Sequence, residues 1–167
     1  MRARILSLCH CPIPRQDHQH GDKVDAKIIN LTPVLGMRDL GCRRVTLAPG
    51  CHAWPFHFHH NNDEMFIVLK GKGSVRLGEK RYPIVEGELI AAPAGDADCA
   101  HQIINDSDEP LTYLCISSMN APDVMEYPDS GKFGVLAGSA PGGDKAERSF
   151  EHYGMRQDAV DYWQDED

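Results

Sequence analysis

The feature that most constrains this chain is a cluster of metal-binding residue types just ahead of a short apolar segment. His57, His59 and Glu64 fall within eight residues, immediately before the apolar run 65–69. Alternate side chains of a β-strand point to one face, so we expect His57 and His59 to project together. After a short turn, Glu64 can open the next strand and return to that face. Two imidazoles and a carboxylate that converge are ligands for a divalent transition metal, which needs one more.

Short apolar segments separated by turn residues fill the middle of the chain. Strands are expected at 23–29, 42–47, 65–69, 74–77, 81–85, 89–92, 101–105 and 111–117. Strands of this length with turn signals every eight to twelve residues are typical of an antiparallel sandwich or barrel. We therefore expect an all-β protein with one domain over 23–163, a loose N-terminal arm over 1–22, and an acidic terminus over 164–167.

Charge and hydropathy narrow the function classes. The net charge is -8 and no Lys/Arg cluster occurs, which argues against nucleic-acid and anionic-membrane partners. No apolar run is long enough to cross a bilayer, and the four apolar-rich residues 5–8 are too few for a secretion signal. We expect a cytoplasmic protein whose six cysteines are mostly free thiols. Cys9, His10 and Cys11 could bind a metal, but their spacing favours an unstructured arm.

Strand parity supplies the missing ligand. If His101 opens a strand, then His101, Ile103 and Asn105 share one face, and in a small closed sheet that face can be the interior. We therefore predict a metal site formed by His57, His59, Glu64 and His101. Asn105 is interpreted either as a hydrogen-bonding group behind the ligands or as a turn contact at the end of its strand.

At this point the chain resembles the cupin superfamily, whose members are double-stranded β-helix (jelly-roll) barrels. The first cupin motif is matched by Gly50, by His57-Phe58-His59, by Glu64 after four residues, and by Gly71. The second motif is matched by Gly87, by Pro93-Ala94-Gly95, and by the segment from His101 to Asn105. One departure is that five residues separate Gly95 from His101, where the general pattern has two. The segments 126–138 and 159–163 are similar to a bacterial single-domain cupin subgroup.

The resemblance implies a site that holds iron, manganese, nickel, cobalt or zinc and leaves coordination positions open. Cupins similar to this one are often labelled sugar-phosphate isomerases, so a metal-dependent isomerase acting on a small polar molecule is one hypothesis. A cupin dioxygenase and a non-catalytic small-molecule or metal sensor are the alternatives. Residues expected to line the cavity are Phe66, Val68, Ile103, Asn105, Tyr113 and Lys132, of which Lys132 would favour an anionic ligand.

No general base can be named with conviction, because beyond the ligands only Tyr113, Glu88 and Lys132 are candidates. Whether the chain is an enzyme is therefore left open, as are its substrate and its metal. Many cupins pair, and a homodimer is expected here. The segment 23–29 and the aromatic tail with Tyr162 and Trp163 could supply the contacts, because large aromatics near a terminus suggest that the tail docks on something.

Overall fold

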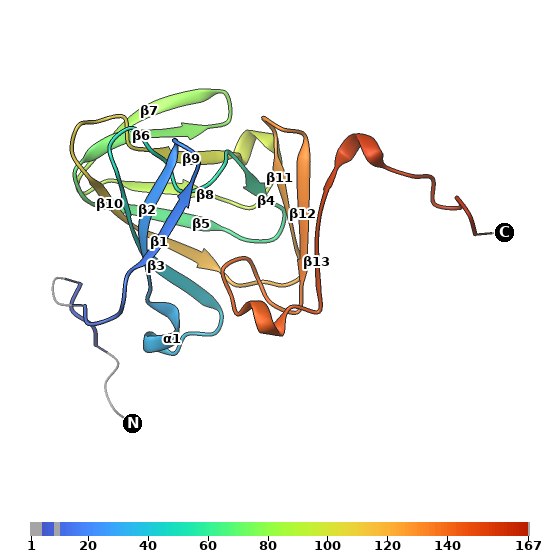
Figure 1. The fold of residues 1–167 in the computed structure, drawn as a ribbon, viewed down its shortest axis with the longest axis horizontal. Helices are drawn as coiled ribbons and strands as arrows, with labels where there is room; N and C mark the ends of the chain where they lie inside the picture. The colour runs from blue at the N-terminus through green and yellow to red at the C-terminus, as the bar shows by residue number, and fades with distance from the viewer. Residues whose placement is uncertain (1–4, 9–10, 167) are drawn as a thin grey trace.

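The computed structural model describes residues 5–8 and 11–166, and its regular structure is dominated by β-strands (Figure 1). The largest sheet has six strands in the order β1-β2-β3-β10-β5-β8. These strands are β1 (Gln16–His20), β2 (Val24–Asn30), β3 (Leu40–Leu47), β10 (Leu111–Ser118), β5 (Glu64–Lys70) and β8 (Leu89–Ala92). All pairings between them are antiparallel.

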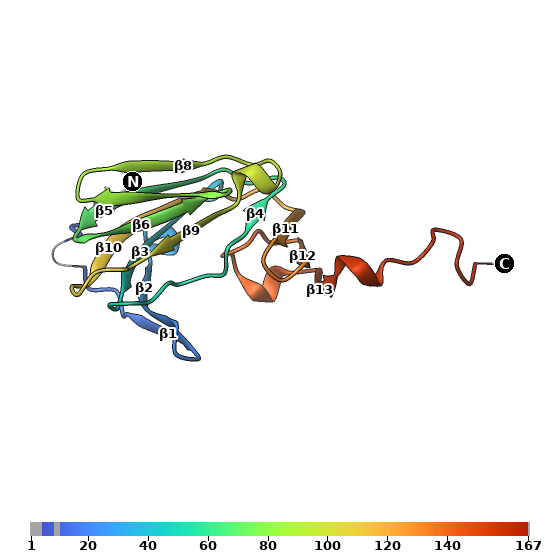
Figure 2. The same cartoon turned by 90° about the horizontal axis from the view of Figure 1, so that it is seen from above.

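Two smaller antiparallel sheets complete the barrel. One has three strands in the order β7-β6-β9, which are β7 (Lys80–Val85), β6 (Lys72–Leu77) and β9 (His101–Ile104). The other has four in the order β13-β12-β11-β4, which are β13 (Phe150–Met155), β12 (Lys132–Ala137), β11 (Asp123–Tyr127) and β4 (Phe58–His59). Figure 2 shows β4, β11, β12 and β13 gathered at one end of the body. This arrangement confirms the predicted all-β barrel.

Among residues 5–8 and 11–166, helical structure is confined to four short pieces. They are α1 (Thr32–Leu35) and three turns of 3-10 helix at Ala97–Cys99, Lys145–Glu147 and Arg156–Asp158. None of the helices in the described ranges is long and apolar enough to span a lipid bilayer.

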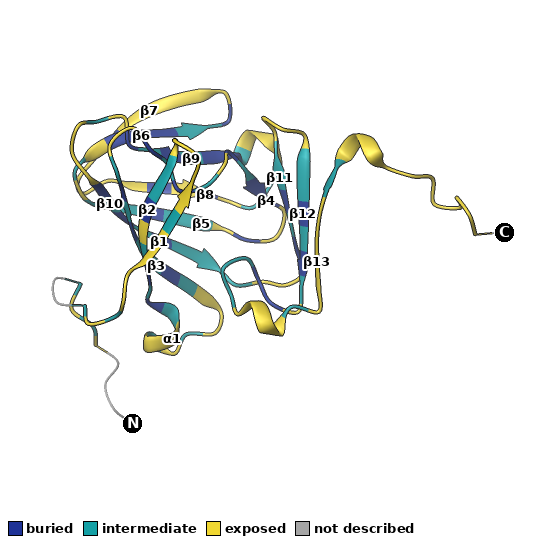
Figure 3. Ribbon diagram, viewed as in Figure 1, coloured by how far each residue is buried: buried dark blue, intermediate teal, exposed yellow. Residues whose placement is uncertain are grey.

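The main core lies between the inner face of the six-stranded sheet and the three-stranded sheet. Val45 and Leu47 of β3, Leu111 of β10, Val75 of β6 and Ile103 of β9 all belong to it and are buried. Their strands appear dark blue along these stretches in Figure 3. The alternation of apolar and polar residues read from the sequence places them there, since every second side chain of a strand faces inward.

The prediction of a loose arm over residues 1–22 is wrong for much of the described part. Residues 16–20 form β1, which pairs along its whole length with β2. Ahead of it, Leu6, Leu8 and Ile13 pack against a second apolar cluster on the outer face of the large sheet. The outer face of the large sheet is apolar, so the protein gains free energy when the arm covers it. This contact could not be predicted from the sequence of the arm alone. Cys9 and His10 lie outside the described residues.

The C-terminal tail leads away from the barrel after β13 (Figures 1 and 2). Val160, Tyr162 and Trp163 are 71%, 83% and 70% exposed. Tyr162 and Trp163 contact each other edge to face, with ring centroids 5.0 Å apart. The aromatic side chains therefore do not dock on the barrel of their own chain.

Candidate metal centre

Three backbone segments bring the predicted ligands to one end of the barrel. His57 and His101 face each other across an antiparallel bridge with two backbone hydrogen bonds, of 3.2 and 2.8 Å. His59 follows on β4, and Glu64 opens β5 as expected. Since His57 and His59 are two residues apart in extended chain, both side chains reach the same cavity.

The structure gathers the four side chains closely. Nε2 of His101 lies 2.7 Å from Oε2 of Glu64, and Nε2 of His59 lies 3.7 Å from the same oxygen. Ligand atoms of His57, His59 and Glu64 all lie within 4.8 Å of one another. The ring centroids of His57 and His101 are 4.7 Å apart. These residues therefore form a candidate metal site at the bottom of the cavity.

Each histidine is held in place by a contact of its Nδ1 atom. Nδ1 of His57 donates to the carbonyl of Pro55 at 2.8 Å, and Nδ1 of His59 donates to the carboxylate of Asp123 at 2.6 Å. These two bonds place the ring proton on Nδ1 and leave the lone pair of Nε2 for a metal. Nδ1 of His101 lies 3.3 Å from the carbonyl of Cys99, while its Nε2 donates to Glu64 at 2.7 Å, a proton that a bound metal would replace. The donor set and its support thus fit a divalent transition metal.

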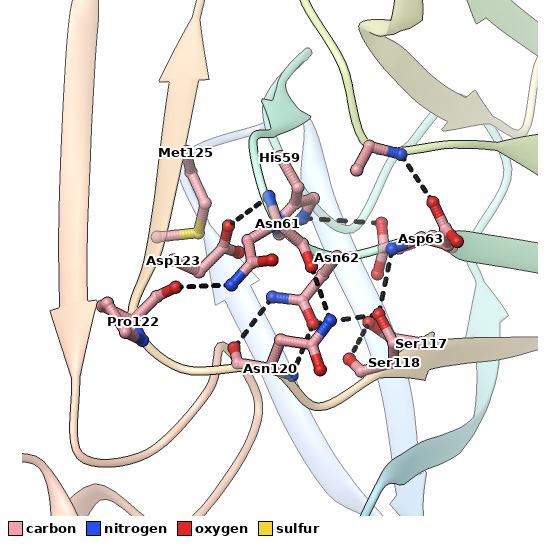
Figure 4. Close-up of polar contacts among 12 residues, drawn as sticks. His59, Asn61, Asn62, Asp63, Ser117, Ser118, Asn120, Pro122, Asp123 and Met125 are labelled. Atoms are coloured by element: carbon pink, nitrogen blue, oxygen red, sulfur yellow. Dashed lines mark hydrogen bonds and ion pairs between the residues drawn. The ribbon is translucent and has the colours of Figure 1, made fainter.

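Asp123 is the supporting residue that sequence reasoning missed. It is 1% exposed at the start of β11, and its second oxygen accepts the backbone N–H of Asn61 at 3.0 Å. Figure 4 shows this carboxylate beside His59 within a network of asparagine and serine side chains. There, the amide of Asn62 donates to the carbonyl of Asn120 at 3.0 Å. The loop before β5 is thereby held against the loop before β11.

Burial and neighbouring groups shift the pKa values of His57, Glu64 and His59. Burial, aided by the nearby His101, lowers the pKa of His57 to about 3, so this imidazole is neutral at pH 7. Burial would raise the pKa of Glu64, but the hydrogen bond with His101 and the neighbouring imidazoles lower it to about 2. Burial is the largest influence on the pKa of His59 and lowers it, but the hydrogen bond to Asp123 and the negative charges of Glu64 and Asp123 together outweigh burial. The net shift is upward, so a metal that binds this ring must compete with a proton.

The cavity above the site has a volume of about 190 Å³. Its wall includes the predicted residues Phe66, Ile103 and Tyr113. Burial is the main cause that raises the pKa of Tyr113 well above its usual value, and it does the same for Cys115, also in the wall. Both groups are therefore uncharged at neutral pH.

Two residues predicted to line the cavity belong to other parts of the barrel. Val68 faces inward, as Phe66 does. It is two residues farther along β5, however, and so lies in the apolar core and not at the cavity. Asn105 is fully buried, and its amide donates to the carbonyls of Leu47 and Glu109 at 3.1 and 2.8 Å. Of its two interpretations, the turn contact at the end of the strand is confirmed.

Lys132 does not line the cavity either. It begins β12 after the hairpin turn, where the chain has reversed, and its ammonium lies 4.5 Å from the ring centroid of Tyr127. It borders a separate surface groove together with His60, Glu126 and Arg156. The prediction that Lys132 supplies the positive charge for an anionic ligand in this cavity is therefore wrong.

The positive charges in the cavity wall come instead from Arg43 and Arg148, which sequence reasoning missed. For Arg43 a signal existed. It has the parity of Val45 and Leu47 on β3, so an alternating strand would turn it inward with these core residues. For Arg148, just before β13, the sequence carries no comparable signal.

The longer spacing in the second motif has a local explanation. The additional residues form the 3-10 turn Ala97–Cys99, capped by Asp96, whose side chain accepts the N–H of Asp98 at 3.0 Å. The N–H of Gly95 donates to the carbonyl of His59 at 2.9 Å. His101 is thereby returned to the start of β9 in the expected position.

Comparison with known proteins agrees with this description. Residues 43–117 match the family model of the cupin domain. Auxin-binding protein 1 of Arabidopsis thaliana is 33% identical over 103 residues, which cover 56% of this chain and 50% of that protein. A glucose-6-phosphate isomerase of Pyrococcus horikoshii is 35% identical over 95 residues, 50% of this chain and 49% of that protein. The chain thus spans about half the length of these curated relatives.

Solved structures extend the similarity to nearly the whole chain. A protein of Acidithiobacillus ferrooxidans, proposed to be a sugar phosphate isomerase, superposes with a TM-score of 0.75 and 24% identity, covering 94% of this chain and 95% of its own. A sugar phosphate isomerase of the cupin superfamily from Silicibacter pomeroyi gives 0.75 and 22%, covering 93% and 94%. At these identities the likeness shows the shared fold.

Proposed function

We propose that this chain, which carries a cupin domain over residues 43–117, binds a divalent transition metal and uses it to bind a small polar molecule. The proposed ligands are His57, His59, Glu64 and His101. The observation that carries the proposal is the orientation of the three imidazoles. Nδ1 of each lies within hydrogen-bond distance of a fixed acceptor, so that Nε2 is directed to the cavity beside Glu64.

The reaction class that we propose is the metal-dependent isomerisation of a sugar phosphate. A metal of this kind polarises a carbonyl or hydroxyl oxygen when it is bound. Phe66 and Ile103 supply an apolar wall that excludes water from the reacting atoms. The glucose-6-phosphate isomerase of Pyrococcus horikoshii, 35% identical over the matched segment, supports this choice. Iron, manganese, nickel, cobalt and zinc are all compatible with the donor set.

A non-catalytic binding protein is the second candidate. Tyr113 and Cys115 in the wall have raised pKa values, so neither serves as a base at neutral pH. A relative that is 33% identical is named as a binding protein, auxin-binding protein 1. Dioxygenase chemistry would use the same ligands, with an open coordination position for oxygen.

Interconversion of sugar phosphates by the purified, metal-loaded protein tests the proposal. We expect turnover that a chelator abolishes and that one of the five metals restores, because substrate binds through the metal. A thermal-shift screen of sugar phosphates, keto acids and catechols against the same preparation identifies the ligand class. Stabilisation by a ligand without turnover of any of these compounds would favour the binding protein. Dioxygen consumption with a catechol would favour the dioxygenase.

We also propose that the partner of the exposed tail is a second copy of this chain. Exposed Tyr162 and Trp163 gain free energy when an interface covers them. Light scattering is expected to give a dimer for the wild type and a monomer for the Tyr162→Ala/Trp163→Ala variant. Val34→Ala, at another exposed apolar position, serves as the control and should remain dimeric. A wild type that is monomeric at micromolar concentration would contradict this proposal.

A further inference from the structure

We infer that Arg43 and Arg148 form an oxyanion-binding site in the wall of the metal cavity, for the phosphate or carboxylate of a small ligand. This inference rests on the proposed function, since the same ligand would reach the metal with a hydroxyl or carbonyl oxygen. It concerns one residue on β3 and one in the loop before β13, which line one cavity. Neither arginine belongs to the set of metal ligands.

Arg148 carries the strongest sign of a missing partner. Its side chain is only 8% exposed, and Nη1 donates to the carboxylate of Glu151 at 2.7 Å. Nε is buried and has no hydrogen-bond partner among the described residues 5–8 and 11–166. A buried donor without an acceptor costs free energy, and more so on a charged group, unless a ligand supplies the acceptor. A guanidinium left in this state is a ready donor for an anion.

Arg43 approaches the cavity from β3 of the large sheet. The register of the large sheet aligns Arg43 of β3 with Cys115 of β10, and Cys115 with Phe66 of β5. All three residues line the cavity, so this row of inward side chains leads from Arg43 toward Glu64. The thiol of Cys115 lies 3.6 Å from the carboxylate of Glu64. Arg43 is thereby placed beside the metal site, and not on the outer surface.

The loop between β12 and β13 positions Arg43. Nη2 donates to the carbonyl of Gly142 at 2.7 Å. Gly142 has φ of +83°, and a Cβ there would lie 2.9 Å from Cζ of Arg43. Glycine is therefore required for the loop to pass this close to the guanidinium. A guanidinium has five N–H donors, so the bond to Gly142 leaves donors for a ligand.

The balance of charge in the cavity favours an anion. Among its described lining residues, Glu64 is the carboxylate, while Arg43 and Arg148 are permanently positive. The proposed divalent metal would add positive charge to the cavity. Glu151, which is 38% exposed, offsets only part of the positive charge of Arg148. The whole chain carries a net charge of -8, so this cavity is a local positive region in an acidic protein.

The shape of the cavity limits the ligand to a small molecule. Its volume of about 190 Å³ is below the roughly 300–1,000 Å³ of sites for drug-sized ligands. Guanidinium groups bind phosphate and carboxylate in a bidentate manner. We therefore expect a compact molecule with an oxyanion at one end and oxygen donors at the other, either a sugar phosphate or a hydroxy or keto acid.

Titration calorimetry on the metal-loaded protein tests the inference, with glucose 6-phosphate, pyruvate and uncharged glucose as probes. We expect at least one anionic probe to bind and glucose to bind at least about tenfold more weakly, because it lacks the charge-assisted hydrogen bonds. A higher affinity for glucose 6-phosphate than for pyruvate indicates a phosphate site, and the reverse order indicates a carboxylate site. If no probe binds, or if glucose binds as well as the anions, the inference is wrong.

Substitutions assign the effect to the two arginines. Arg148→Gln and Arg43→Gln are each expected to weaken binding of the anionic probe on the order of tenfold or more, with unchanged metal content. Arg148→Lys should restore part of the affinity, since it keeps the charge but loses the planar fork. The control is Arg156→Gln, which breaks a similar pair with Glu126 outside the cavity and should leave affinity unchanged. Wild-type affinity in both glutamine variants overturns the inference.

Metal analysis of the same samples separates this inference from the proposed function. If the wild type holds no metal but binds the anion through Arg148, the metal-centred function fails and the oxyanion site stands. If the metal is present and the anion affinity is independent of both arginines, the oxyanion site fails and the metal centre stands. Unfolding temperatures of all variants without ligand show whether a loss of affinity reflects a loss of folding.

Discussion

The variant His57→Ala/His101→Ala is expected to be purified without the metal that the wild type holds. Two of the four proposed ligands are then missing, and the pair faces each other across a β-bridge with ring centroids 4.7 Å apart. Removal of a residue that merely supports a ligand lowers metal affinity by about 10- to 100-fold, so the loss of two direct ligands must exceed that. Elemental analysis of the purified protein measures the effect.

Thermal unfolding gives a second measure of the same prediction. Metal at about 100 times its dissociation constant is expected to stabilise the wild type by about 2.7 kcal/mol and to leave the double variant unchanged. His60→Ala is the matched control, because His60 is adjacent to His59 but points outward, where it pairs with Glu126 at 2.8 Å. Equal metal content in the wild type and the double variant would refute the proposed site.

Asp123→Ala is expected to weaken metal binding by about 10- to 100-fold without removing a ligand. The carboxylate accepts the Nδ1–H of His59 at 2.6 Å and so keeps Nε2 unprotonated. Without it the ring can rotate or take the other tautomer. Asp123→Asn should have a smaller effect, because the amide oxygen of asparagine can still accept this bond. Some loss should remain, because the amide nitrogen can instead donate to Nδ1 and favour the other tautomer. Competition with a metal chelator of known affinity measures both variants.

The control for Asp123 is Asp129→Asn. Asp129 is 59% exposed and pairs with Arg76 at 2.8 Å on the surface, so its loss should cost at most about 1 kcal/mol in stability and nothing in metal affinity. Asp123 also accepts the N–H of Asn61, so unfolding of metal-free Asp123→Ala must be measured alongside. If chelator competition gives the wild-type affinity for Asp123→Ala, the carboxylate has no role in orienting the ligand.

Much of the barrel and of the candidate site could be predicted because β-strands repeat every two residues. Parity alone indicated that His57 and His59 share a face and that Glu64 and His101 each open a strand, and the structure has this arrangement. The same rule applied to β3 places Arg43 on the inward face with Val45 and Leu47.

Predictions that depended on which segments meet were less successful. Lys132 is predicted to line the cavity, but the hairpin between β11 and β12 turns it to another groove. The N-terminal arm is predicted to be loose, because its own sequence contains no strong pattern. It is held by β2 and by the apolar outer face of the large sheet, and neither partner can be identified from the arm itself.

The sequence by itself determined the class of fold and the identity of the candidate ligands, because alternation along a strand and the short spacing of His57, His59 and Glu64 are local properties of the chain. The tertiary structure decided what surrounds them. Asp123 reaches His59 across 64 residues, and the carbonyl of Gly142 reaches Arg43 across 99. Such partners depend on how three sheets close into one barrel, which is set by the packing of the whole core and by no single segment.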